Sequence, residues 1–384
     1  MGIITVKPTE ENVRFLGRYL KYGTPENDDY AVYLSFSASS VDFRTNADEV
    51  EAEFVTDDLR KEENSRAYVG IFIDNDDEPY MRFALTDERK TYKIFNRDEY
   101  NAAKREEAEK YYIKNGIHMK LHEHLMHKIQ IAKMSEAAFG SVGVAKIMLS
   151  RERRIEMRRT NPHRHLVQFV GDSITCGYGN ETALATDSFS TGTENPFKAY
   201  AVMACRKVDF DYELVSWSGI GARSSWTDSG KLNDTVLMKD IYPYADKVIS
   251  DRKKIKPEEW HPLKKPDIIF INLGTNDYSY TKVSEERNAE FEKAYLELIR
   301  MVYEKNPHAR IICALGIMGQ ELCPQIADAV EKAKNEMGIS RITSLVLPVQ
   351  RDEDGRAADF HPTIKTHERA SERVARVIAY ESIV

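Results

Sequence analysis

Four short motifs from residue 171 onward contain the residue types that transfer of an acyl group requires. They span 171–173, 216–221, 272–277 and 359–362, and in turn they contribute a serine, a glycine, an asparagine and a histidine. A serine with a histidine as its base makes a nucleophile, and amide N–H groups stabilise the oxyanion formed by attack on an ester. A lone Asp-Ser pair would more simply cap a helix, so the interpretation depends on all four motifs together.

The residues of these motifs divide into distinct catalytic roles. We expect Ser173 to be the nucleophile and His361 the general base that later protonates the leaving alcohol. The N–H groups of Ser173 and Gly219, with the side-chain amide of Asn276, would form the oxyanion hole. Asp359, two residues before His361, is the candidate third catalytic member that orients the imidazole. A backbone carbonyl could orient the imidazole instead, and Asp359 would then cap the final helix.

Four aromatic residues near the motifs are candidates for binding a sugar substrate. They are Tyr178, Trp217, Trp226 and Tyr278. Flat aromatic faces suit the apolar faces of sugar rings, although an aromatic side chain more often packs in a core. We expect one or two of the four to form a platform for a carbohydrate.

The motifs lie in a part of the chain whose pattern predicts an α/β domain. From residue 166 onward, short apolar runs alternate with stretches that have apolar residues at three- and four-residue spacing. The expected strands are 166–170, 214–217, 267–273, 310–315 and 343–349, and the expected helices include 285–305, 323–337 and 364–380. Five strands with crossover helices imply a doubly wound parallel sheet that binds ligands at the carboxyl ends of its strands. Three of the four motifs directly follow such an end.

The first 150 residues follow a different pattern. Apolar and polar residues alternate over 31–36, 50–55, 67–73 and 126–132, as in strands with one buried face. Many short strands predict an all-β sandwich of the jelly-roll type. The charged segment 98–115 is expected to be a helical insertion. Its tyrosines would pack on the sandwich or on a second subunit, and the second case would make the protein a homo-oligomer.

Length and charge limit the organisation and the partners. The chain has 384 residues, more than one ordinary compact domain, and we predict a β-sandwich over 1–150, a basic linker over 151–165 and a catalytic domain over 166–384. The net charge of −7 does not favour nucleic acid or an anionic membrane as a partner. The N-terminal residues show no signal-peptide pattern, from which we expect a cytoplasmic protein.

No metal site or cofactor site is predicted. The four cysteines form no CxxC pair, and their spacing suggests neither a disulfide framework nor a zinc site. The histidine-rich run 122–127 lacks HExxH spacing, because Met126 stands where the second histidine would be. We expect these histidines to lie on the surface or on a strand face.

The ordered set of motifs resembles the SGNH hydrolase superfamily, whose four named residues correspond to Ser173, Gly219, Asn276 and His361. The GxSxG elbow of the alpha/beta-hydrolases does not occur in the sequence. The longer sequence GDSITCGYGN at 171–180, preceded by a β-rich domain, is similar to carbohydrate esterase family 2. That family joins an N-terminal jelly roll to an SGNH domain and removes acetyl groups from plant polysaccharides, notably xylan.

The resemblance implies a serine esterase that acts on acetylated plant-cell-wall polysaccharide or oligosaccharide. Acetylated xylan or xylo-oligosaccharides would be the substrate, with an acetyl-Ser173 intermediate and no cofactor. A deacetylase of glucomannan or another acetylated glycan is the nearest alternative. A carbohydrate-binding protein with a vestigial site is a further alternative, and the presence of all four site residues argues against it. One departure from most SGNH enzymes is Ala358, which stands where they have an aspartate three residues before the histidine.

Overall fold

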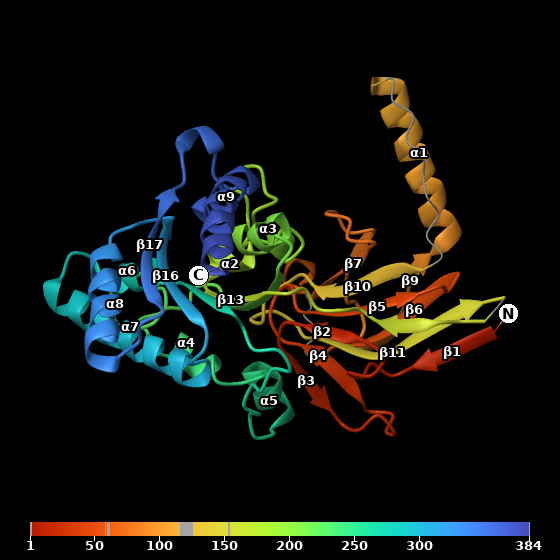
Figure 1. The fold of residues 1–384 in the computed structure, drawn as a ribbon, viewed down its shortest axis with the longest axis horizontal. Helices are drawn as coiled ribbons and strands as arrows, with labels where there is room; N and C mark the ends of the chain where they lie inside the picture. Colours follow the sequence, from red (N-terminus) through yellow and green to blue (C-terminus); the bar gives the residue numbers. More distant parts are fainter. Residues whose placement is uncertain (1, 58, 60–61, 116–125, 153, 384) are drawn as a thin grey trace.

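The computed structural model describes residues 2–57, 59, 62–115, 126–152 and 154–383. The molecule is elongated, with a β-sandwich at one end and an α/β domain at the other (Figure 1). The N-terminus lies at the far end of the sandwich. Within the described ranges, no helix is both long and apolar enough to cross a membrane. The predicted fold class, a parallel five-stranded sheet preceded by an all-β sandwich, is confirmed.

Two six-stranded sheets with antiparallel pairing form the sandwich. One has the order β3-β4-β11-β6-β9 with β1 beside β11, and the other has the order β12-β5-β10-β7-β8 with β2 beside β5. The strands of the first are β1 (Gly2–Val6), β3 (Tyr19–Tyr22), β4 (Ala31–Leu34), β6 (Glu49–Val55), β9 (Arg89–Asn96) and β11 (Val142–Arg151). Those of the second are β2 (Arg14–Leu16), β5 (Ser40–Thr45), β7 (Tyr68–Ile73), β8 (Met81–Ala84), β10 (His127–Lys133) and β12 (Met157–Arg159). Inward side chains such as Val41, Phe54 and Ile71 fill the space between the sheets.

Strand β12 lies inside the segment 151–165, which the sequence predicts as a linker. It pairs with β5, so this part of the segment belongs to the edge of a sandwich sheet. Arg158 and Arg159 of β12 are exposed. A three-residue edge strand without a buried apolar face has no alternation to detect, which is why the pattern does not indicate it.

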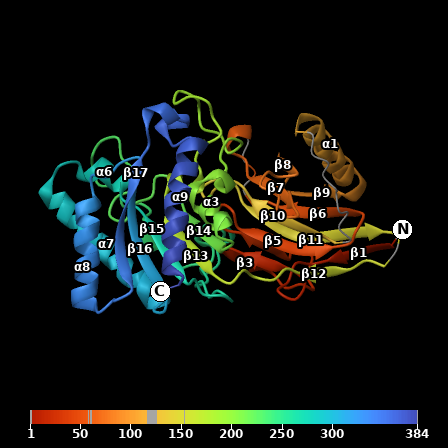
Figure 2. The same cartoon turned by 45° about the horizontal axis from the view of Figure 1, so that its top comes forward.

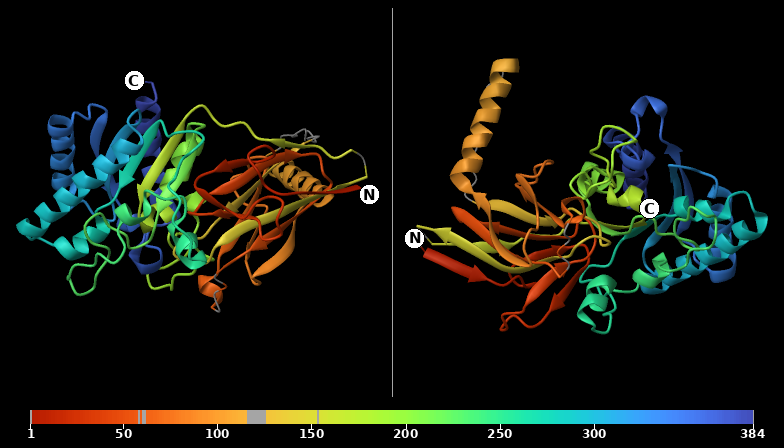
Figure 3. Two further views of the ribbon diagram at one scale, coloured as in Figure 1. Left: turned by 90° about the horizontal axis from the view of Figure 1, so that it is seen from below. Right: turned by 180° about the vertical axis from the view of Figure 1, so that it is seen from behind.

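The predicted helical insertion is confirmed as α1 (Arg97–Asn115), which projects from the sandwich (Figure 3). Tyr100 in its first turns is buried and packs against Phe95 of β9, with ring centroids 5.9 Å apart. Tyr111 and Tyr112 near its end are about half exposed. The insertion is therefore anchored on the sandwich through its N-terminal part.

The α/β domain contains a five-stranded parallel sheet of order β14-β13-β15-β16-β17. Its strands are β13 (Leu166–Gly171), β14 (Asp211–Ser216), β15 (Ile268–Asn272), β16 (Arg310–Ile317) and β17 (Ile342–Val349). The order reverses around β13, because the chain moves outward to β14 and then returns to the other side of β13. Ligands of open parallel sheets bind outside the carboxyl ends of the strands at such a reversal.

Helices cover both faces of the parallel sheet (Figure 2). On one face lie α3 (Tyr200–Lys207) and α9 (Ile364–Glu381), and on the other lie α4 (Met238–Ile241), α7 (Glu285–Lys305) and α8 (Cys323–Met337). Short helices and turns complete the domain: α2 (Ser173–Cys176), α5 (Lys247–Lys253), α6 (Thr275–Thr281), η2 (Pro196–Lys198), η3 (Asp352–Asp354) and η4 (Ala358–Phe360). Helix α9 buries Ala370, Val374 and Ile378, which recur at four-residue spacing and form the apolar stripe that holds it on the sheet.

The two domains share a core. Phe72 and Met134 of the sandwich pack in one apolar cluster with Phe197 and Tyr200 of the α/β domain, and the rings of Phe72 and Phe197 are 4.3 Å apart. Buried polar contacts cross the same interface. The Arg18 guanidinium donates to Glu213 Oε1 at 3.1 Å and to the carbonyls of Tyr242 and Tyr244 at 2.5 and 2.8 Å.

Replacement of Arg18 tests how much this interface stabilises the fold. Both Arg18 and Glu213 are almost fully buried, so Arg18→Ala leaves a carboxylate without its cation and should lower the free energy of unfolding by about 3–5 kcal/mol. Lys21→Ala is the matched control, because it removes an exposed ion pair with Glu10 and should cost at most about 1 kcal/mol. Urea unfolding measures both losses. Equal losses would show that the buried pair does not hold the domains together.

Candidate active site

Ser173 begins helix α2 two residues after β13 ends. The Asp172 carboxylate caps this helix by accepting the N–H of Ile174 at 3.0 Å. Gly171 allows the sharp turn, because a Cβ at this position would lie only 2.0 Å from Thr175 Oγ1. As the first residue of a helix, Ser173 has an N–H without an intrahelical partner. The turn therefore presents both a hydroxyl and a free amide at the edge of the sheet.

His361 lies beside Ser173, although 188 residues separate them in the chain. The distance from His361 Nε2 to Ser173 Oγ is 2.8 Å, within reach for proton transfer. On the other side of the ring, Nδ1 is 3.2 Å from the carbonyl oxygen of Ala358. If Nδ1 carries the proton and donates to this carbonyl, Nε2 is left as the acceptor for the serine hydroxyl.

Asp359 does not provide the partner of the imidazole Nδ1 among the hydrogen bonds of the described residues. Its carboxylate accepts the Tyr178 hydroxyl at 2.8 Å, and the Tyr178 ring packs against the imidazole with centroids 4.3 Å apart. Asp359 and Phe360 have φ values of 51° and 63°, in the left-handed region. Of the two alternatives for orienting His361, the geometry favours the backbone carbonyl.

Burial lowers the pKa of His361, and the carbonyls of Ala358 and Asp359 with the Asp359 charge offset part of this effect. The direction follows from the cost of moving a cation out of water. A lowered pKa keeps the imidazole neutral near pH 7, and only the neutral ring can accept a proton from a hydroxyl.

Gly219 lies in a turn directly after β14. Ile220 N–H donates to the Trp217 carbonyl at 3.2 Å, and Gly219, the third residue of this turn, has φ of 80°. This is the pattern of a type II turn, in which the N–H of the third residue takes no part in the turn hydrogen bond. The Gly219 carbonyl accepts the N–H of Trp226 at 2.8 Å. The Gly219 N–H therefore stays available to a ligand.

Asn276 lies in the first turn of α6, just past β15. Its side-chain nitrogen donates to the Ile220 carbonyl at 2.9 Å and to Asp172 Oδ2 at 3.3 Å. The amide thus connects three of the four motifs, but both of its hydrogens face protein acceptors. Donation to an oxyanion would replace the longer bond to Asp172. Burial raises the pKa of Asp172 to about 7, so its carboxyl is partly protonated near neutral pH and competes less for this donor.

Asp277 supports the loop that follows Gly219. Its buried carboxylate accepts the N–H groups of Ala222, Arg223 and Ser224 at 3.1, 2.6 and 2.9 Å. Three backbone donors on one carboxylate fix the path of the loop, so Asp277 has a structural position next to the site.

The aromatic candidates separate into two groups. Tyr178 lies on the imidazole, and Trp217 and Trp226 line a depression of about 290 Å³ together with Gly219. Trp226 is 57% exposed, as a sugar platform must be. Tyr278 packs against the core on the α7 side of the sheet, and Lys282 Nζ lies 5.6 Å from its ring centre. Trp217 also packs partly against this core, but Tyr278 is not among the residues that line the depression. The structure thus brings Tyr178, Trp217 and Trp226 to the site and leaves Tyr278 outside it.

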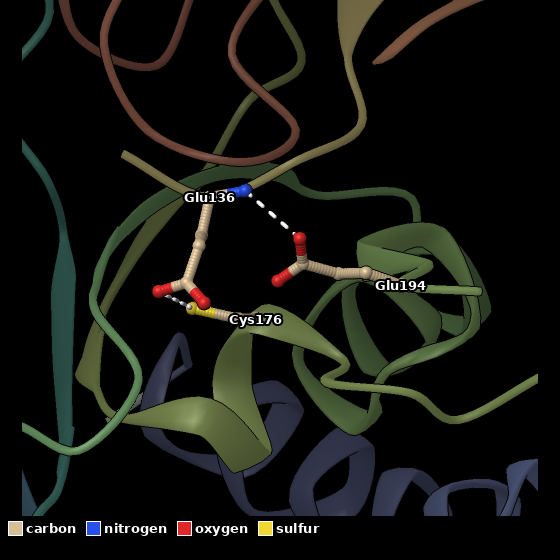
Figure 4. A group of neighbouring side chains, drawn as sticks. All are labelled: Glu136, Cys176 and Glu194. Carbon is tan, nitrogen blue, oxygen red and sulfur yellow. Dashed lines mark hydrogen bonds between the residues drawn. The ribbon is translucent and has the colours of Figure 1, made fainter. Parts of the chain in front are cut away.

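A buried polar cluster next to the site includes Cys176 of the GDSITCGYGN sequence, but the sequence analysis assigns no role to its members. Glu136, Cys176 and Glu194 place one oxygen or sulfur atom each within 4.8 Å of one another (Figure 4). Such atoms are able to ligate a metal, but Glu136 Oε2 already accepts the Ser218 N–H at 2.6 Å and the Cys176 thiol at 3.8 Å. The three residues come from three distant segments, so no spacing pattern links them.

The histidine-rich run is only partly described. Residues 122–125, like His118, lie outside the described residues. His127 in β10 is buried, and its Nδ1 lies 2.6 Å from Asp74 Oδ2. It occupies a strand face in the sandwich, as predicted.

Comparison with known proteins agrees with this geometry. The GDSL-like Lipase/Acylhydrolase family matches residues 169–370. The cellulase/esterase CelE of Acetivibrio thermocellus is 30% identical over 264 residues, which cover 66% of this chain and 30% of the length of CelE. An acetylxylan esterase / glucomannan deacetylase of Cellvibrio japonicus is 21% identical over 364 residues, which cover 94% of this chain and 87% of that protein.

The fold as a whole also has a solved counterpart. The acetyl xylan esterase Est2A of the rumen bacterium Butyrivibrio proteoclasticus superposes with a TM-score of 0.80 at 18% identity, covering 99% of this chain and 98% of that one. Both domains are therefore included in the similarity. Since the family match spans more than half of the chain, this protein belongs to the GDSL-like lipase/acylhydrolase family, and its two-domain fold is that of the family 2 carbohydrate esterases.

Proposed function

We propose that this protein is a serine carbohydrate esterase that removes O-acetyl groups from acetylated xylan or xylo-oligosaccharides. The observation that carries the proposal is the 2.8 Å hydrogen bond between Ser173 Oγ and His361 Nε2 in a domain of the acylhydrolase family. A vestigial, purely sugar-binding site is disfavoured, because the nucleophile and its base are both present and within bonding distance.

The reaction would proceed by double displacement. Ser173 Oγ attacks the acetyl carbonyl carbon while His361 Nε2 takes the hydroxyl proton. The tetrahedral intermediate collapses, the C–O bond to the sugar breaks, and His361 returns the proton to the leaving sugar oxygen. Water, deprotonated by His361, then attacks the acetyl-Ser173 ester and releases acetate, and the proton returns to Ser173.

The oxyanion would be bound by the N–H groups of Ser173 and Gly219 with Asn276 Nδ2. The first two donors come from adjacent strands, since β13 pairs with β14 with Gly171 beside Ser216. Asn276 follows β15, which pairs with β13 on its other side. Parallel pairing supports this arrangement, because it puts the loops that carry the three donors next to one another. Donors held in place before the reaction would lower its barrier.

The sugar would bind at the depression lined by Trp217 and Trp226 beside Gly219. An exposed indole offers a flat apolar face to a pyranose ring. The Cellvibrio relative carries both acetylxylan esterase and glucomannan deacetylase in its name, which supports these two glycans as the substrates to compare. Deacetylation of glucomannan remains the alternative within the same chemistry.

Acetate release from acetylated xylan, acetylated glucomannan and xylo-oligosaccharides tests the proposed function. Wild-type protein should release acetate, fastest from the xylan-derived substrates. Ser173→Ala should reduce kcat by at least about 10³-fold, because no nucleophile remains. The control Ser340→Ala removes an exposed hydroxyl of the same domain, outside the four motifs and the depression, and should leave the rate unchanged. A wild type without activity on any of these esters would refute the proposal.

The pH profile tests the environment of His361. Because burial lowers the pKa of this imidazole, it stays neutral to lower pH than an ordinary histidine. We expect kcat/KM to fall as pH decreases, with a midpoint below about 6.5. Asp172→Asn is the control, because Asp172 also titrates near neutral pH and Asn keeps the capping oxygen. A midpoint at or above 6.5, or one that disappears in this variant, would contradict the assignment to His361.

The role of Asp359 is tested by comparison with His361. Its carboxylate binds Tyr178 and not the imidazole, so Asp359→Asn should lower kcat/KM by less than about tenfold, whereas His361→Ala should lower it by about 10³-fold or more. Asn tolerates the positive φ of this position. The variant should also shift the acid limb to lower pH, since the Asp359 charge raises the pKa of His361. Losses of similar size would make Asp359 a full third catalytic member.

A further inference from the structure

We propose that Glu136 of the sandwich domain is a positioning residue that holds the Gly219 N–H in place for the oxyanion. The inference rests on the proposed esterase function. Glu136 follows β10 by three residues, and its side chain enters the α/β domain between α2 and the turn after β14. The sandwich would then contribute directly to the geometry of the reaction.

The contacts of Glu136 reach both backbone segments that supply oxyanion donors. Glu136 Oε2 accepts the N–H of Ser218, the residue before Gly219, at 2.6 Å. The same oxygen accepts the thiol of Cys176 at 3.8 Å, and Cys176 ends the short helix that Ser173 begins (Figure 4). One carboxylate oxygen therefore connects the nucleophile helix to the glycine turn.

The Gly219 N–H belongs to the peptide group in the middle of its turn. This middle peptide is the one that rotates by about 180° between type I and type II turns, and such a rotation would reverse the direction of the Gly219 N–H. The bond from Ser218 N–H to Glu136 fixes the peptide before it, and the bond from Trp226 N–H to the Gly219 carbonyl fixes the peptide after it. The Gly219 N–H is thus held in place by the peptide groups before and after its own.

Glu136 is itself rigidly held. It is fully buried, and its backbone N–H donates to Glu194 Oε2 at 3.0 Å. Among the described residues, Glu136 Oε1 and Glu194 Oε1 are buried without a hydrogen-bond partner. Burial, with repulsion from Glu136, raises the pKa of Glu194 well above its ordinary value, and burial also raises that of Glu136. One oxygen of each carboxyl lies within 4.8 Å of the other, and a proton bound by the pair would relieve their repulsion. A neutral amide at position 136 also removes this repulsion.

The same loop of the sandwich also reaches the histidine. Phe139 stacks on Phe189 at 5.2 Å, Phe189 stacks on Tyr178 at 3.9 Å, and Tyr178 packs on the imidazole of His361 at 4.3 Å. Residues 136 and 139 therefore contact the oxyanion side and, through two rings, the base side of the site. This second connection supports a positioning role for the loop.

Two variants of Glu136 separate the effect of side-chain length from the effect of side-chain charge. Glu136→Gln keeps an oxygen that can accept the Ser218 N–H and should keep kcat within about threefold of wild type. Glu136→Asp keeps the acid but is one methylene shorter, so its oxygen withdraws by about 1.5 Å and the bond to Ser218 is lost. We expect kcat to fall by about 10–10²-fold with KM within about threefold, because the displaced donor acts on the transition state more than on the bound substrate.

Gln130→Ala is the matched control. Gln130 is also buried, lies on β10 of the same domain and contacts the α/β domain through the Tyr212 hydroxyl at 3.5 Å, away from the four motifs. It should lower the Tm without lowering kcat. The proposal is overturned if Glu136→Asp keeps kcat within twofold, if Glu136→Gln loses as much as Glu136→Asp, or if Gln130→Ala loses kcat to the same extent at a similar Tm.

Labelling with a fluorophosphonate distinguishes failure of this proposal from failure of the proposed function. The reagent phosphonylates a serine nucleophile with loss of fluoride, needs the oxyanion donors but no sugar, and is followed by intact mass. If wild type is labelled at Ser173 but deacetylates no glycan, the substrate proposal fails, and slower labelling of Glu136→Asp still supports positioning. If wild type deacetylates glycans and Glu136→Asp is labelled at the wild-type rate, positioning fails alone. Loss of wild-type activity on dialysis against EDTA, restored by Zn²⁺, would also overturn it, because the cluster would then be a metal site.

Discussion

The hydrogen bond between Ser173 and His361 sets the constraint that the rest of the catalytic domain satisfies. It joins the first loop of the parallel sheet to the loop before the last helix, so the site exists only when β13 and α9 are both in place. The strand order supports this, because β13 is an inner strand of the sheet with β14 on one side and β15 on the other. Each flanking strand delivers one further motif to the same edge. Strand pairing thus positions Ser173, Gly219 and Asn276, the proposed nucleophile and oxyanion donors, and core strands are among the parts of a protein that open least readily.

Holding a histidine with a carbonyl rather than a carboxylate has a physical consequence. A carboxylate stabilises the imidazolium strongly, whereas the Ala358 carbonyl orients the ring with a smaller effect on its charge. Burial then dominates and keeps the ring neutral. The Asp359 carboxylate belongs to the residue after Ala358, but it accepts the Tyr178 hydroxyl. It therefore holds the Tyr178 ring, which packs on the imidazole of His361. The left-handed backbone at Asp359 and Phe360 directs the Ala358 carbonyl back toward His361, and such strain is tolerated only where surrounding contacts hold it.

Much of the fold and of the proposed site could be predicted from the sequence, because short local patterns indicate both. Apolar runs predict the five strands, and glycine, serine, asparagine and histidine after them predict the site, since carboxyl ends of parallel strands meet at one edge. The sequence leaves the partner of the His361 Nδ1 open between Asp359 and a backbone carbonyl, and it does not indicate the role of Glu136. Ala358 acts through its backbone carbonyl, a group that every residue has. Glu136 acts across the domain interface, and it stands 82 residues before Ser218 in the chain. Strand β12 escapes detection for a related reason, because an exposed three-residue edge carries no pattern of burial.

The interface between the domains explains why these long-range contacts keep their geometry. Apolar residues of the sandwich, among them Phe72 and Met134, belong to the same buried cluster as the helices on one face of the parallel sheet. Arg18 and Glu136 bring buried polar groups across the same boundary, and the side-chain hydrogen bonds that both make among the described residues reach the α/β domain. Separation of the domains would expose the apolar core to water and break these polar contacts at once. Such a boundary favours one relative arrangement of the domains, and a sandwich held this firmly can fix the position of a catalytic turn.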